Sequence, residues 1–191
     1  MNYATIKYCD IANGPGVRTS LFVSGCTHHC RNCFNAEAWD FNYGKPFTEE
    51  VIQDILKSCE PQYAAGLSLL GGEPMEPVNQ RGLVILVRRF KKLFPQKTVW
   101  CYTGYTYETD LRKGGKVFTE VTDELLSLTD VLVDGEFIQE QYDISLRFRG
   151  SGNQRLIDLA ATRRSGETKL WQDEAVFATH KWQETETGGK T

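Results

Sequence analysis

The sequence predicts a single-domain α/β fold with mostly parallel strands, either a wound sheet or a partial (β/α) barrel. The chain has 191 residues, a length that suits one domain with its own core. Short β-rich segments alternate with longer segments of helical spacing, which is typical of parallel β-α units with right-handed crossovers. Each predicted strand ends in a polar or glycine-rich turn, so these turns should gather along one edge, where ligands bind in such folds.

The first predicted elements lead to a group of cysteines. Residues Tyr3 to Asp10 are predicted to form a short strand, and Ala12 to Gly16 are dense in turn-forming residues. The segment Arg18 to Gly25 is β-rich and continuous enough for a buried strand. It runs directly into Cys26 to Cys33, which places the cysteines at the C-terminal end of a strand.

Two helix-and-strand units follow. Apolar side chains recur at helical spacing between the expected N-cap Thr48 and Pro61. The segment Gly66 to Leu70 is predicted as a buried strand that leads into the turn Gly71 to Pro74, and a second helix is expected from about Asn79 to Phe94. The pattern then repeats, with strands and helices expected at Thr98 to Tyr102, around Leu111, at Val121 to Leu128 and at Asp130 to Asp134.

The last part of the chain differs in composition. Residues 139 to 158 are basic and rich in turn formers, whereas the chain from about Leu159 onward is polar without sustained periodicity. We therefore expect one domain at residues 1 to 158 and a flexible polar extension at residues 159 to 191. Within this extension, Lys169 to Trp171 and Ala175 to Ala178 have the composition of short strands.

Composition limits the class of protein. With 40% hydrophobic and 25% charged residues, the chain has no apolar run near the ~18 residues that a membrane span needs, and no signal segment opens it. We therefore expect a cytoplasmic protein without a membrane partner. A net charge of -3 argues against a nucleic-acid surface, which is normally basic. Three scattered cysteines, Cys9, Cys59 and Cys101, are expected to be small buried apolar residues.

The cysteines at C-x3-C-x2-C spacing, Cys26, Cys30 and Cys33, put three thiolates on one short loop. A cubane [4Fe-4S] cluster normally takes four cysteines, so three would leave one iron open, and an open position is typical of catalytic metal sites. Two alternatives remain from spacing alone. One is a Cys3His zinc site that includes His28 or His29, and the other is a set of reduced thiols without metal.

A ligand for the open iron would be a small molecule with an amine and a carboxylate, such as S-adenosylmethionine. An electron passed into its C-S bond would release a 5'-deoxyadenosyl radical, and cluster potentials of roughly -700 to +450 mV make this attainable. The turn Gly71-Gly72-Glu73-Pro74 suits such a ligand. Its glycines allow close backbone approach, and the region of Glu73 can accept hydrogen bonds from an ammonium group.

Together the motifs carry a resemblance to the radical S-adenosylmethionine superfamily. Within it the chain resembles the activating component of anaerobic ribonucleoside-triphosphate reductase, over about residues 1 to 158 and with the partial barrel as the implied fold. The motifs that match are the cysteine loop, Cys26 to Cys33, and the segments Asp10 to Cys26, Leu69 to Pro74, Trp100 to Thr106, Asp130 to Phe137 and Arg147 to Arg155.

The resemblance implies an oxidoreductase that uses a [4Fe-4S] cluster and S-adenosylmethionine. Its 5'-deoxyadenosyl radical would remove a hydrogen atom from a glycine Cα of the large reductase subunit, which then stores a glycyl radical. The implied partners are that large subunit and an external low-potential electron donor. No catalytic side chain is implied beyond the cluster and the cofactor.

The resemblance also assigns site residues. The metal ligands are Cys26, Cys30 and Cys33. The cofactor would lie against the backbone at Asn32, Cys33 and Phe34, with its methionine amine at Gly71, Gly72, Glu73 and Pro74, and with Thr103, Gly104 and Asp134 nearby. Whether Asp134 meets the cofactor or a monovalent cation is left open. Many superfamily members have an aromatic residue where this chain has Asn32.

Other functions remain open at this point. One is a radical S-adenosylmethionine enzyme of another kind, such as a formate-lyase activase or an enzyme with a small-molecule substrate. Another is a zinc-binding module without catalysis. The segment Arg147 to Arg155 favours the reductase activase, and it is a candidate for docking the partner or closing over the site.

Overall fold

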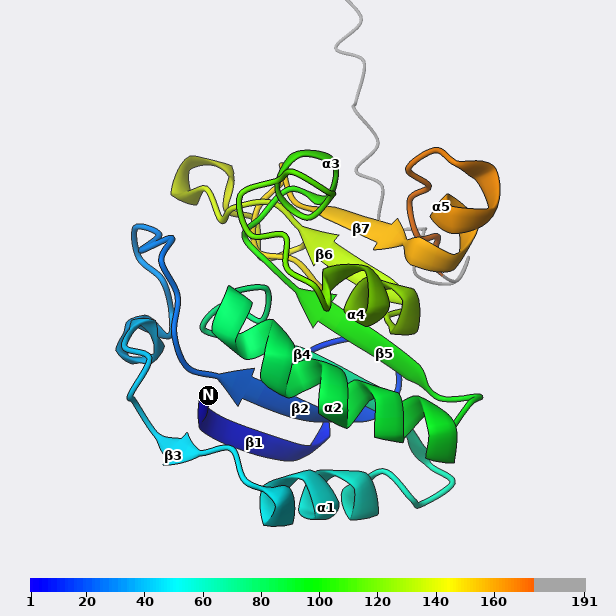
Figure 1. Ribbon diagram of the computed structural model, residues 1–191. Helices are drawn as coiled ribbons and strands as arrows, with labels where there is room; N and C mark the ends of the chain where they lie inside the picture. Colours follow the sequence, from blue (N-terminus) through cyan, green and yellow to red (C-terminus); the bar gives the residue numbers. More distant parts are fainter. Residues whose placement is uncertain (174–191) are drawn as a thin grey trace, which may run out of the picture.

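The computed structural model describes residues 1–173, which form one seven-stranded sheet with helices packed against it (Figure 1). In chain order the elements are β1 (Asn2–Asp10), β2 (Val17–Val23), the 3-10 helix η1 (Ala36–Trp39), β3 (Lys45–Pro46), α1 (Glu49–Ser58), β4 (Ala64–Gly71), α2 (Pro77–Leu93), β5 (Thr98–Tyr102), α3 (Tyr107–Asp110), α4 (Thr122–Leu128), β6 (Val131–Asp134), the 3-10 helix η2 (Gln139–Gln141), β7 (Arg155–Asp158) and α5 (Leu159–Ser165). None of the helices in this part of the chain has the length and apolar character of a membrane span.

The strand order is β3-β1-β2-β4-β5-β6-β7. The four central strands β2, β4, β5 and β6 run parallel, and antiparallel strands flank them on both sides. Within the described residues the two edge strands do not pair with each other, so the sheet stays open. The predicted fold class, an α/β fold built as a partial (β/α) barrel, is confirmed.

The two faces of the sheet have different covers. Figure 1 shows α1, α2 and α4 along one face, where Val99 and Cys101 of β5 belong to the main core cluster with side chains of these helices. Successive side chains of a strand point to opposite faces, and Trp100 and Tyr102 accordingly belong to a smaller cluster on the other side.

The periodic elements are confirmed with shifts of one or two residues at their ends, and five short elements were missed: η1, η2, β3, β7 and α5. The strands β3 and β7 are too short for a periodic pattern. The helix α5 contradicts the expectation of unpatterned chain after Leu159: Asp158 caps its first turn by accepting a hydrogen bond from the amide of Ala161, and Gly166 ends it with a φ of 74°.

The described chain continues past the expected boundary after residue 158. As expected for an extended segment, Leu170 forms an isolated bridge with Ile157. The ring of Trp171 packs edge-on against Trp100, with 5.0 Å between the ring centroids. The segment Ala175 to Ala178, expected as a strand, lies outside the described residues.

The parallel pairing brings the predicted turns together. Val23 pairs with Gly71, and Tyr102 pairs with Val133, so these strands end at nearly the same level. The cysteine loop, the turn after β4 and the turn after β5 therefore meet at one edge, as the alternation of strands and helices predicted.

Candidate active site

A cavity of about 640 Å³ opens at this edge of the sheet. Its volume lies within the range of small-molecule and cofactor sites, about 300–1,000 Å³. Most of the predicted site residues line it: Cys26, Asn32, Cys30, Cys33, Phe34, Gly71, Gly72, Glu73, Thr103 and Gly104. Two of the predicted residues, Pro74 and Asp134, are not among its lining residues.

The three cysteines share this cavity but differ in environment. Cys26 is buried, and desolvation raises the pKa of its thiol to about 12. Burial and the charge of Glu136 also raise the pKa of Cys30, whose Sγ donates to Glu136 Oε1 at 3.7 Å. Because metal ligation requires thiolates, binding at these cysteines has to release protons.

The histidines of the loop have other contacts. The Nε2 atom of His28 lies 3.1 Å from Glu73 Oε2, and the ring of His29 stacks on Trp39 at 4.6 Å with an interplanar angle of 5°. In residues 1–173 no three His, Cys, Asp or Glu side chains are grouped around the position of one metal ion. Cysteines that hold a cubane cluster bind separate irons and do not need to meet at one point. The donor set therefore fits a cluster better than a Cys3His zinc site.

The two glycines after β4 permit backbone packing against the start of the cysteine loop. A Cβ on Gly72 would lie 2.6 Å from the carbonyl oxygen of Gly25, and Gly71 has a φ of 109°. The amide of Gly72 donates to the carbonyl of Val23 at 2.7 Å, and that of Glu73 donates to Gly25 at 2.8 Å. The close approach predicted for these glycines is thus made to the chain that precedes Cys26.

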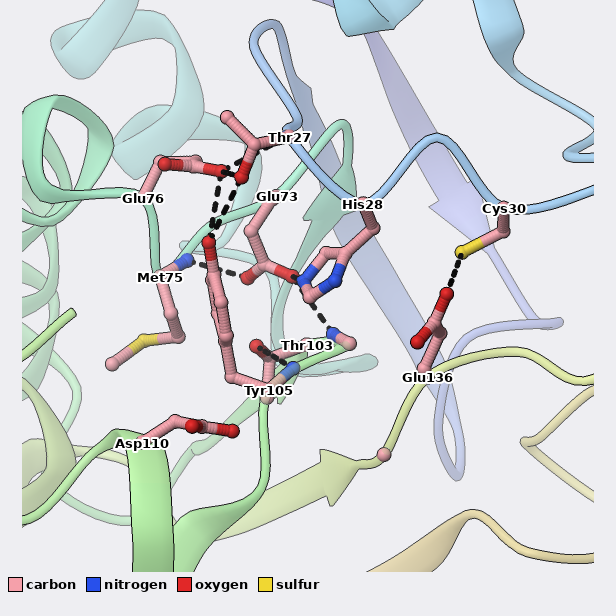
Figure 2. A network of polar contacts seen from close by, with 12 residues as sticks. Thr27, His28, Cys30, Glu73, Met75, Glu76, Thr103, Tyr105, Asp110 and Glu136 are labelled. Atoms are coloured by element: carbon pink, nitrogen blue, oxygen red, sulfur yellow. Dashed lines mark hydrogen bonds and ion pairs between the residues drawn. The ribbon is translucent and has the colours of Figure 1, made fainter. Parts of the chain in front are cut away.

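The carboxylate of Glu73 joins three segments and is only 1% exposed. Its Oε1 atom accepts from the amide of Met75 at 2.7 Å, while Oε2 accepts from the amide of Gly104 at 2.7 Å and lies next to His28 (Figure 2). Burial alone would lower the pKa of His28, but the hydrogen bond and charge of Glu73 raise it above its ordinary value. Glu73 thereby links its own turn to the cysteine loop and to the turn after β5.

Asp134 occupies a different position from the one its place at a strand end suggested. Its carboxylate is 1% exposed, accepts from Arg155 Nε at 2.9 Å and accepts from the amide of Tyr107 at 2.9 Å. Arg155 also donates to Glu108, and this pair lowers the pKa of Glu108 to about 2. Arg155 and Glu108 were not predicted as neighbours of the site, because nothing in their sequence spacing relates them to Asp134.

The second half of the cysteine loop lies at the mouth of the cavity. Asn32 has a φ of 58°, a conformation that Asn tolerates better than most residues. Its Nδ2 atom donates to Gln139 Oε1 at 3.3 Å. Phe34 is 84% exposed beside it. Asn32, Cys33 and Phe34 all line the cavity.

Turn residues absent from the predicted site also contact the loop. Thr27 and Tyr105 both donate to Glu76, a residue that does not line the cavity. Thr103 takes part less directly, since its Oγ1 accepts from the amide of Tyr105 at 3.1 Å. The only sequence signal for Glu76 was its place two residues after the Glu73-Pro74 pair.

Comparisons with known proteins agree with this site. A family model described as a 4Fe-4S single cluster domain matches residues 12–157. A protein of Vibrio cholerae named anaerobic ribonucleoside-triphosphate reductase-activating protein is 42% identical over 159 residues, which covers 81% of this chain and 96% of the relative. Proteins of the same name from Escherichia coli K12 and enterobacteria phage T4 are 38% and 37% identical, covering 81% and 82% of this chain and 96% and 93% of their own lengths.

The matched region contains the cysteine loop, the turn after β4 and the turn after β5, which are the segments that form the cavity. An iron-sulfur cluster site at Cys26 to Cys33 agrees with the family description and with the donor set. The chain belongs to the family of anaerobic ribonucleoside-triphosphate reductase-activating proteins.

Proposed function

We propose that this protein activates anaerobic ribonucleoside-triphosphate reductase by reductive cleavage of S-adenosylmethionine. The observation that carries the proposal is that Cys26, Cys30 and Cys33 line one cavity together with the two glycine-containing turns. A [4Fe-4S] cluster held by these cysteines would supply the electron that cleaves the C-S bond of S-adenosylmethionine, and the 5'-deoxyadenosyl radical so formed would take a hydrogen atom from a glycine Cα of the reductase.

Different groups of the cavity would bind the cluster and the cofactor. The thiolates of Cys26, Cys30 and Cys33 hold the cluster, and the exposed backbone from Asn32 to Phe34 faces the adenosyl group. A carboxylate has about four acceptor positions. Glu73 uses three of them for protein donors, which leaves one for the methionine amine beside Gly71 and Gly72.

The remaining predicted residues act at the border of the cavity. Thr103 and Gly104 line it at the end of β5, within reach of a bound cofactor. Pro74 is buried in the turn behind Glu73. Asp134 holds Arg155 and the amide of Tyr107, so we assign it to shaping this edge of the sheet, in place of contact with the cofactor or a monovalent cation.

The partner is the large reductase subunit, with an external low-potential donor supplying electrons. Several residues of the segment from Phe137 to Gly150 line the cavity, and Gln139 and Glu140 of this segment contact the second half of the cysteine loop. Arg149 and Gln154 of the basic segment Arg147 to Arg155 also line the cavity, which supports the docking or closing role expected for that segment. The cytoplasm as the location stays a prediction.

The test is anaerobic reconstitution of the cluster followed by reduction and addition of S-adenosylmethionine. We expect about four irons and four sulfides per chain, and methionine with 5'-deoxyadenosine as products. Adding the reductase should produce a glycyl radical detectable by electron paramagnetic resonance. A colourless protein with one zinc, or a reduced cluster without cleavage, would contradict the proposal.

A further inference from the structure

A pair of buried carboxylates holds the first half of the cysteine loop. We call this pair, Glu73 and Glu76, the acidic clasp. Its two members are 1% and 5% exposed, and Figure 2 shows them facing the residues that follow Cys26. Glu73 contacts His28, while Glu76 contacts Thr27. The two loop residues directly after the first cysteine are therefore each held by one carboxylate.

The hydrogen bonds of Glu76 to the loop and to Tyr105 all end on one carboxylate oxygen. Its Oε1 atom accepts from the amide of Thr27 at 3.0 Å, from Thr27 Oγ1 at 2.6 Å and from the hydroxyl of Tyr105 at 3.0 Å (Figure 2). Tyr105 belongs to the turn after β5 and also packs against the ring of His28, with 4.3 Å between the centroids. One carboxylate oxygen thus joins the cysteine loop to the turn after β5.

The position of Glu76 explains how a buried carboxylate is tolerated there. Glu76 is the N-cap residue of α2, a helix of 17 residues, and its carbonyl accepts from the amides of Asn79 and Gln80. Negative charge is stabilised at a helix N-terminus by the helix dipole. The longest helix of the described chain therefore offsets the burial of this charge, and it fixes the carboxylate relative to the main core.

We infer that Glu76 is a positioning residue, which holds Thr27 so that Cys26 is in place before a cluster binds. Glu76 does not line the cavity, and it acts through the loop without touching the cluster or the cofactor. The inference rests on the cluster that the proposed function requires. It concerns the loop in the protein without cluster as well as with it. Partners that orient metal ligands contribute strongly to affinity, and their loss typically costs 10–100-fold.

The main variant is Glu76→Gln, which keeps the shape of the side chain and removes its charge. We expect a chelator to remove the reconstituted cluster about tenfold faster than in the unsubstituted protein. The midpoint potential should move to a more positive value, because a negative charge near the cluster has been lost. Amide hydrogen exchange of residues 26–30 in the cluster-free protein should also become faster.

The matched control is Glu120→Gln. Glu120 pairs with Arg81 of α2, and the two side chains are largely exposed, at 64% and 53%. This variant should leave the chelation rate within twofold and the potential unchanged. Equal effects of the two substitutions on these readouts would overturn the inference, because they would show only a general loss of stability.

Milder variants keep the test valid if Glu76→Gln does not fold. Thr27→Val and Tyr105→Phe each remove one hydroxyl donor to Glu76. We expect each to speed cluster loss. Where Glu76→Gln folds, its combination with Thr27→Val should have less than the sum of the two single effects, since both substitutions break the same link. Additive effects, or unchanged chelation and potential in all these variants, would overturn the role of Glu76.

The outcomes separate this inference from the proposed function. A protein that binds four irons, cleaves S-adenosylmethionine and is unaffected by the Glu76 and Thr27 substitutions would refute the positioning role alone. A protein that binds a cluster sensitive to Glu76→Gln but never cleaves S-adenosylmethionine would refute the proposed function and support the positioning role.

Discussion

The two halves of the cysteine loop are held by different kinds of contact. After Cys26, Thr27 and His28 are attached to the buried acidic clasp. The second half contacts the segment around η2 instead, where Arg31 and Glu140 lie 3.6 Å apart with side chains 78% and 71% exposed. One half is joined to the core, and the other lies at the mouth of the cavity.

The fold stabilises the first half of the loop more strongly than the second half. Buried hydrogen bonds to a charged group contribute about 1.5–3 kcal/mol each, whereas exposed ion pairs contribute about 0–1 kcal/mol. The geometry at Cys26 is therefore set by tertiary structure before any ligand binds. The accessible half, with Asn32 and Phe34, is left open toward a cofactor and a partner.

The largest effect is expected from the cysteines, which belong to both halves. Cys26→Ser, Cys30→Ser or Cys33→Ser should each abolish the cluster and all S-adenosylmethionine cleavage, because a hard serine oxygen replaces a thiolate poorly at iron. Iron content and product analysis measure this. As controls, the serine variants of Cys9, Cys59 and Cys101 should keep the cluster, and loss of iron in one of those would contradict the ligand assignment.

The next largest effect should come from the contact that supports the first half. Gly72→Ala would place a Cβ 2.6 Å from the Gly25 carbonyl and 2.9 Å from that of Ala38. We expect a loss of about 1–3 kcal/mol in the free energy of unfolding, with weaker cluster binding. Denaturant unfolding of the cluster-free protein checks it. The control Gly152→Ala, where the nearest atom is 3.8 Å away, should change stability by less than about 0.5 kcal/mol.

Substitutions in the basic segment Arg147 to Arg155 should affect activation of the partner more than cleavage of the cofactor. Arg149 lines the cavity and donates to the carbonyl of Gln154, while Arg147 pairs with Asp173. Changing both arginines to Ala should lower the glycyl-radical yield severalfold and leave uncoupled formation of 5'-deoxyadenosine largely unchanged. Electron paramagnetic resonance and product analysis compare the two. Equal losses would assign the arginines to the cofactor site.

A smaller effect is expected from the second half itself. Arg31→Ala removes an exposed ion pair with Glu140, so cluster loss to a chelator should change by less than twofold. In the same assay, Glu76→Gln should speed cluster loss about tenfold, because Glu76 positions the loop. If Arg31→Ala matched Glu76→Gln, the contrast between the two halves of the loop would be wrong.

The smallest effect should come from pH acting on Glu108, outside the loop. Its carboxylate has a pKa of about 2 beside Arg155, against 4.5 for the free side chain. The stabilisation of the folded protein by ionised Glu108 is fully present above about pH 4.5, and it is lost as the pH falls toward 2. The stability difference between the unsubstituted protein and Glu108→Gln should therefore shrink over this range. A constant difference in unfolding free energy would contradict it.

The fold class and most of the predicted site residues that line the cavity could be inferred from the sequence. Helical and strand periodicities are local, so α1, α2 and β5 were predicted close to their bounds, and parallel β-α units imply that their turns meet at one edge. The cysteine spacing, the two glycines and Thr103-Gly104 stand next to predicted strand ends. Their convergence in one cavity followed from that placement.

The pairing of the polar side chains could not be predicted from the sequence. Thr27 and Glu76 are 49 residues apart, and Tyr105 is 29 residues beyond Glu76. No local pattern links such positions, because their contact depends on how three turns are oriented after the strands have paired. Asp134 is a second example. Its place at a strand end indicated contact with the cavity, but its carboxylate accepts a hydrogen bond from Arg155 of the adjacent antiparallel strand β7. This contact was not predicted because β7 was too short to predict.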